Sequence, residues 1–169
     1  VFHELGAVAL AVYALALAVP QQLRFGSKVL ATAALPKLSS GDPKAIHKAL
    51  PRKAFIIFLV SVLIAGGYIA VAPFFFLTFF PEYASAILYS QFFALVILFF
   101  PSTLYQQYLT ARMEKEKLYI LQVVPFAKIL LVLVLIPLYG IWGAIASILV
   151  VEVFRLLLIM YLFTKIRPA

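Results

Sequence analysis

The sequence predicts an all-α integral membrane protein, a helical bundle of about five transmembrane helices. Hydrophobic residues make up 66% of the 169 residues and charged residues only 12%, and the mean hydropathy is +1.11. Soluble domains are about half apolar and about one quarter charged. Because backbone polar groups in lipid must bond within their own segment, helices are favoured, and the alternating pattern of barrel strands is absent. We therefore expect one transmembrane domain over residues 1–169.

Five apolar stretches are each long enough to cross a bilayer, which takes about 20 helical residues. They are residues 6–35, 54–80, 84–109, 118–139 and 141–163. The first stretch is long enough to tilt or to extend beyond the hydrocarbon core. The chain starts at Val1 and has neither a basic leading segment nor a small-residue cleavage pattern. We interpret this start as a truncation of a longer protein.

Ten of the 14 basic residues lie between or after the apolar stretches, and they suggest an orientation. They are Lys37, Lys44, Lys48, Arg52, Lys53, Arg112, Lys115, Lys117, Lys165 and Arg167. The connections after the second and fourth stretches carry no basic residue. The positive-inside rule therefore places both basic loops, residues 36–53 and 111–117, and the C-terminus in the cytoplasm. Residues 44–50 could form a short surface helix, but we interpret their charges as fixing topology alone.

The other four cations, Arg24, Lys28, Lys128 and Arg155, fall inside the apolar stretches. A cation near the bilayer centre costs about 2.5 to 3.5 kcal/mol on insertion scales, so it usually faces a polar cavity or a partner. This placement suggests a pathway for an anionic substrate.

The first stretch is the most polar of the five. Gln21, Arg24 and Lys28 recur at i, i+3 and i+7, which places them on one helix face. Pro20 removes a backbone donor and can bend the helix beside a cavity, although proline bends also occur as plain packing features. Lys28 lies close enough to the predicted helix end that its side chain could instead reach the interface.

Lys128 lies near the middle of the fourth stretch, where reaching the interface is difficult. Its alternative is an interhelical pair with Glu152, the only acidic residue inside the five stretches. Glu152 and Arg155 are at i and i+3 in the fifth stretch, and we predict a structural ion pair between them. One carboxylate cannot neutralise four cations. The excess requires an anion, supplied either by a substrate or by another part of the protein.

The remaining polar residues of the third stretch suit either sugar contacts or helix packing, and we favour packing. They are Gln91, Ser102, Thr103, Gln106 and Gln107. Catalytic signals are weak, because His3 and His47 have no paired carboxylate and cysteine is absent. We expect no enzyme activity, no metal, no cofactor and no nucleic-acid partner.

Three segments resemble polysaccharide flippases. They are YALALAVPQQLRFGSKVLATAALPKLS at residues 13–39, FFPEYASA at 79–86 and IPLYGIWGAIAS at 136–147. The resemblance covers nearly the whole chain. It is to the C-terminal part of O-antigen-type oligosaccharide flippases, within the multidrug, oligosaccharidyl-lipid and polysaccharide exporter superfamily.

That resemblance implies the last five of about twelve helices, which form most of one lobe of a two-lobed transporter in the cytoplasmic membrane. It also implies alternating access for a polyprenyl-diphosphate-linked oligosaccharide, with the N-terminal lobe and membrane lipids as further partners. Gln21, Arg24 and Lys28 would contact the substrate, with Lys128 behind them. Two alternatives stay open. One is a cation-coupled drug exporter of the same superfamily, and the other is a membrane scaffold that transports nothing.

Overall fold

Every regular element of the described residues is a helix, which confirms the all-α prediction. In this computed structural model the described residues are 2–33, 35–112 and 114–166, and their side chains are described except at residues 2–8, 27, 28, 30, 31, 37 and 43. The α-helices are α1 (Phe2–Ala33), α2 (Leu35–Ser40), α3 (Pro43–Phe79), α4 (Ala86–Ala94), α5 (Phe100–Ala111), α6 (Lys115–Leu121) and α7 (Val123–Thr164). Two 3₁₀ helices, η1 (Pro81–Tyr83) and η2 (Leu95–Phe99), complete the set.

The predicted loop over residues 36–53 is mostly helical, so that prediction is wrong. Asp42 caps α3, because its carboxylate oxygens accept hydrogen bonds from the backbone N–H groups of Lys44 and Ala45, each at 3.2 Å. Such a cap satisfies donors that have no partner within the helix, and proline in the first turn also favours a helix start. α3 therefore begins at Pro43 rather than at residue 54, and Pro51 is accommodated inside it.

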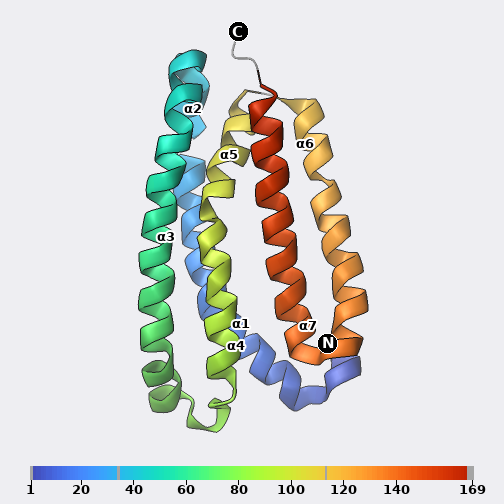
Figure 1. Cartoon of the computed structure of the whole chain (residues 1–169). Helices are drawn as coiled ribbons and strands as arrows, with labels where there is room; N and C mark the ends of the chain where they lie inside the picture. Colours follow the sequence, from blue (N-terminus) through green and yellow to red (C-terminus); the bar gives the residue numbers. More distant parts are fainter. Residues whose placement is uncertain (1, 34, 113, 167–169) are drawn as a thin grey trace.

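The third apolar stretch forms one nearly continuous rod of α4, η2 and α5 (Figure 1). The change to 3₁₀ geometry comes directly before Pro101. Proline has no N–H to donate to the preceding turn, and its ring crowds that turn, so the helix tightens there. The carbonyl of Phe99 accepts a hydrogen bond from the Ser102 hydroxyl at 2.7 Å.

α7 contains two helical halves joined by a sharp bend at Gly140. This residue has φ 58° and ψ −131°, a conformation that only glycine adopts readily. In Figure 1 the first half (orange) and the second half (red) run in opposite directions. The bend requires a second glycine, because a Cβ atom at Gly143 would lie 1.9 Å from the carbonyl oxygen of Leu135. The sequence boundary predicted between residues 139 and 141 coincides with this bend.

Three helical stretches of the described chain are long and apolar enough to cross a membrane. They are Lys44–Phe79, Ala86–Ala111 and Lys115–Thr164. The predicted number of about five spans is therefore not confirmed. α1 is not among these three stretches of the described chain. The third stretch includes both halves of α7 and the bend between them.

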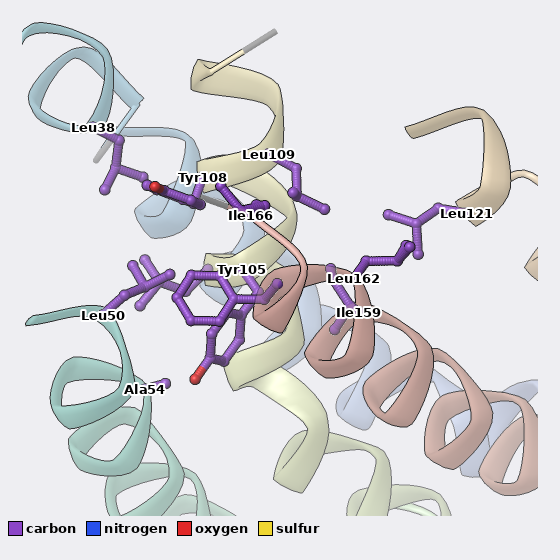
Figure 2. Packing of buried hydrophobic residues seen from close by; sticks show 12 residues of the cluster. Leu38, Leu50, Ala54, Tyr105, Tyr108, Leu109, Leu121, Ile159, Leu162 and Ile166 are labelled. Carbon is purple, nitrogen blue, oxygen red and sulfur yellow. The ribbon is translucent and has the colours of Figure 1, made fainter. Parts of the chain in front are cut away.

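The rod of α4, η2 and α5 occupies the centre of the bundle and contacts α1, α3 and α7. Its upper part packs in a hydrophobic cluster that draws residues from five helices and from Ile166 beyond α7 (Figure 2). The cluster consists of Leu38, Leu50, Ala54, Leu104, Tyr105, Tyr108, Leu109, Leu121, Ile159, Leu162, Phe163 and Ile166. Between helices in a membrane, such packing is stabilised by many van der Waals contacts, because lipid is as apolar as the core itself. This packing fixes α5 against the second half of α7, and both helices supply the site described below.

The basic segments gather at one end of the bundle. Figure 1 places α2, the junction of α5 and α6 and the C-terminal end of α7 together at the top of the view. Arg112 joins two of these segments, because its guanidinium donates to the carbonyl oxygen of Gly41 at 2.9 Å. This arrangement agrees with the predicted grouping of the charges, while the side of the membrane that they face stays a prediction.

Candidate functional site

A cleft of about 600 Å³ lies between α1, the central rod and both halves of α7. Pockets for small ligands commonly have volumes of about 300 to 1,000 Å³. The polar and charged lining is unusual for so apolar a chain. It consists of Tyr13, Gln21, Arg24, Thr103, Gln106, Gln107, Lys128 and Arg155. This cleft is the candidate functional site.

α1 supplies two of the residues singled out in the sequence, Gln21 and Arg24. They are one helical turn apart, so they share the face that the helix turns toward the cleft. Pro20 lines the cleft beside them and lies inside α1, which continues through it. The backbone of Lys28 belongs to the same helix, but its side chain lies outside the described residues.

Arg24 and Arg155 share one carboxylate. The Arg24 guanidinium donates a hydrogen bond to Oε1 of Glu152, and Nε of Arg155 lies 3.3 Å from Oε2 of the same residue. Glu152 is almost fully buried, with 7% of its side chain exposed, whereas 38% of the Arg24 side chain is exposed. Glu152 therefore forms the predicted i, i+3 ion pair with Arg155 and a second ion pair with Arg24 of α1. The sequence spacing does not indicate this second pair.

Ser102 extends this network to the central rod. Its hydroxyl accepts a hydrogen bond from the Arg155 guanidinium and donates to the carbonyl of Phe99. The Ser102 side chain is fully buried. The network therefore connects α1, the second half of α7 and α5 through hydrogen bonds to charged groups, which contribute about 1.5 to 3 kcal/mol each.

Lys128 approaches the cleft from the first half of α7. Its side chain is exposed, and no ion pair involving it occurs among the described residues. The alternative of a pair with Glu152 is not realised there, because both carboxylate oxygens of Glu152 face the two arginines. Among the described side chains, three cations of the cleft and the carboxylate of Glu152 leave an excess of two positive charges.

The uncharged polar residues of α5 belong to the site more directly than the sequence interpretation allowed. Thr103, Gln106 and Gln107 line the cleft, and they are spaced i, i+3 and i+4 along one face of α5. Gln91, in contrast, packs between helices, since its side-chain amide donates to the carbonyl of Ile69 at 3.0 Å. The packing interpretation therefore suits Gln91, whereas the i, i+3, i+4 spacing on α5 was the available signal for a cleft-lining face.

Other candidate chemistry lies away from the cleft. His47 is stacked on Phe163, with ring centroids 4.2 Å apart, at the basic end of the bundle. His3 has no described side chain. The described residues contain no cluster of His, Asp and Glu suited to holding a metal ion.

The chain matched no protein-family model, no curated protein and no solved structure.

Proposed function

We propose that this chain is part of a membrane transporter that flips a polyprenyl-diphosphate-linked oligosaccharide across the cytoplasmic membrane by alternating access through the cleft. The single observation that carries the proposal is the charge of the cleft. Arg24, Arg155 and Lys128 line the cleft, and among the described residues the only carboxylate paired with any of them is that of Glu152, which contacts the two arginines. Embedded cations are costly, and an excess of them in a cavity suits an anionic ligand.

A diphosphate fits the chemistry of these groups. Guanidinium groups bind phosphate oxygens through two parallel hydrogen bonds, and lysine contributes a compact charge. Glu152 neutralises part of the charge of both arginines. An entering diphosphate would share the partly exposed guanidinium of Arg24 and would approach Lys128 across the cleft. The prenyl tail would stay in the bilayer beside the apolar outer surfaces of α3 and α7.

The remaining parts of the proposal extend beyond the described bundle. About five spans, a cytoplasmic C-terminus and an N-terminal lobe that completes the transport pathway belong to this proposal together. It is supported by the three apolar helical stretches and by the grouping of basic segments at one end (Figure 1). Membrane lipids would cover the apolar side chains exposed on α3 and α7.

A non-transporting scaffold is the second candidate, and one observation favours it. Arg24 and Arg155 both have an acidic partner, as embedded cations in a purely structural bundle should. The scaffold does not account for Lys128, which lines the cleft without an ion pair among the described residues. A cation-coupled drug exporter fits less well, because a coupling cation would have to displace two guanidinium groups from Glu152.

The test is a transport complementation assay with Arg24→Ala and Lys128→Ala at matched expression. Arg52→Ala and Lys53→Ala are the control variants, because these cations are exposed at the basic end of the bundle and outside the cleft. Loss of one hydrogen bond to a charged group costs about 1.5 to 3 kcal/mol, so we expect export to fall by about 10- to 100-fold in the cleft variants. The controls should export normally. Normal export by both cleft variants would overturn the proposal and leave the scaffold.

A further inference from the structure

The polar face of α5 contains no charged residue, unlike the cleft-lining faces of α1 and α7. Thr103, Gln106 and Gln107 are uncharged, and all three line the cleft on one side of the helix. The opposite side of α5 carries Tyr105 and Tyr108, which are buried in the hydrophobic cluster of Figure 2. We call Thr103, Gln106 and Gln107 the amide face.

The side chains of the amide face have no hydrogen-bond partner within the described protein. Two hydrogen bonds form nearby on α5, but neither uses these side chains. The backbone carbonyl of Gln106 accepts from the Thr110 hydroxyl at 3.0 Å, and the Ser102 hydroxyl accepts from Arg155. Gln106 is exposed, Thr103 and Gln107 are half-buried, and all three line the cleft, so their polar groups are open to a ligand there. Amide groups in membrane helices usually bond to a neighbouring helix, as Gln91 does with the carbonyl of Ile69. The unused donors and acceptors of the amide face therefore suit a ligand in the cleft.

The amide face also lies directly beside the charged network. Thr103 follows Ser102, and the Ser102 hydroxyl accepts from Arg155, which lies against Glu152. The cationic side chains of the cleft thus lie on α1 and α7, whereas α5 contributes only neutral polar groups to it. Arginine and lysine only donate hydrogen bonds, whereas a glutamine amide both donates and accepts. A sugar hydroxyl also does both, while the oxygens of a diphosphate only accept.

We propose that the amide face is the glycan-recognition subsite of the cleft, where the first sugar next to the diphosphate bonds to Gln106 and Gln107. This inference rests on the proposed function. It assigns the diphosphate of the ligand to the cationic residues of α1 and α7, and the first sugar to α5. Arg24 and Lys128 hold the charge, and the amide face distinguishes a glycosylated carrier lipid from a bare one.

The experiment compares two probes with the full chain in lipid nanodiscs. One probe is farnesyl diphosphate, and the other is farnesyl diphosphate with one N-acetylglucosamine on its terminal phosphate. The tested variant combines Gln106→Leu with Gln107→Leu, a change that keeps the side-chain volume and suits an apolar helix. Gln122→Leu is the matched control, because Gln122 is exposed and lies outside the cleft.

We expect the double variant to bind the glycosylated probe about tenfold more weakly, which corresponds to two lost neutral hydrogen bonds. Its affinity for farnesyl diphosphate should equal that of the unmodified chain, which also reports that the variant is folded. Gln122→Leu should bind both probes normally.

Three results would overturn the inference. They are an unchanged affinity of the double variant for the glycosylated probe, an equal loss for both probes, or equal affinity of the unmodified chain for the two probes. In each case Arg24→Ala and Lys128→Ala report separately on the proposed function. If these two variants still weaken both probes, the anionic cleft stands without the glycan subsite. If they weaken neither, or if the unmodified chain binds neither probe, the proposed function fails together with the inference.

Discussion

Replacing Glu152 by glutamine tests the charged network most directly. The substitution keeps the shape of the side chain and one acceptor oxygen but removes the only described negative charge that is paired with the arginines of the cleft. Arg24 and Arg155 would then face each other without a carboxylate between them. The excess in the cleft would rise from two positive charges to three.

The expected loss of stability follows from burial. Removing one partner of a buried ion pair typically costs about 3 to 5 kcal/mol, because the other charge is left uncompensated. Glu152 is well buried and 20% of the Arg155 side chain is exposed, so this pair should approach that range. The Arg24 side chain is 38% exposed, so solvent screens its ion pair with Glu152 and this pair contributes less to the stability. Because glutamine keeps one acceptor oxygen, we expect Glu152→Gln to lower the free energy of unfolding by about 2 to 3 kcal/mol.

Thermal unfolding in detergent, followed by intrinsic fluorescence, measures this loss. For chains of this length 1 kcal/mol corresponds to about 2 to 4 °C, so Glu152→Gln should lower the Tm by about 5 to 10 °C. Glu116→Gln is the matched control, since Glu116 is exposed in the first turn of α6. Its Tm should change by less than about 2 °C.

A double variant separates charge from packing. Combining Glu152→Gln with Arg155→Gln removes one charge of each sign and returns the excess in the cleft to two. If uncompensated charge is the cause, the double variant should unfold at a higher temperature than Glu152→Gln alone. Inorganic pyrophosphate should also raise the Tm of Glu152→Gln more than that of the unmodified chain, because the ligand replaces the missing negative charge. An unchanged Tm in Glu152→Gln, or a double variant less stable than the single one, would refute the reasoning.

The bend of α7 and the Ser102 bridge give two further predictions with internal controls. Gly143→Ala should lower the Tm markedly, because the added Cβ overlaps a backbone carbonyl oxygen in the first half of α7, whereas Gly66→Ala has open space in α3 and should raise the stability by about 0.5 to 1 kcal/mol. Equal Tm values for the two alanine variants would contradict this close approach. Ser102→Ala should cost about 1 to 3 kcal/mol, because Arg155 loses an acceptor in a buried site. Ser61→Ala is its control, since that buried hydroxyl bonds only to the preceding turn of its own helix, and a similar loss in both serine variants would argue against the bridge.

The helical fold could be predicted from the sequence because its cause is local. Apolar runs of about 20 residues require internally satisfied backbone groups, and Gly140 after Pro137 marks the end of one run. The helical extension of α3 back to Pro43 was missed, although Asp42 followed by proline is a known start signal. The five basic residues in residues 36–53 favour a topology-determining loop, whereas the cap at Asp42 favours a helix.

The site was predictable only in part. Gln21 and Arg24 share a helix face, so their spacing was enough to place them together. The spacing of Glu152 and Arg155 likewise indicated their proximity. The hydrogen bond between Arg24 and Glu152 joins residues that are 128 positions apart. No local pattern contains that information.

The sequence by itself predicted the helices, their apolar composition, the excess of cations within the apolar stretches and the helix boundary at Gly140, because each depends on neighbouring residues or on composition. Only the tertiary structure shows that Glu152 pairs with Arg24 as well as with Arg155. It also shows that Gln106 and Gln107 of α5 line the same cleft as Lys128. These facts depend on how the central rod packs against α1 and α7. Helix packing is set by many weak contacts between distant residues, and a one-dimensional pattern cannot specify their sum.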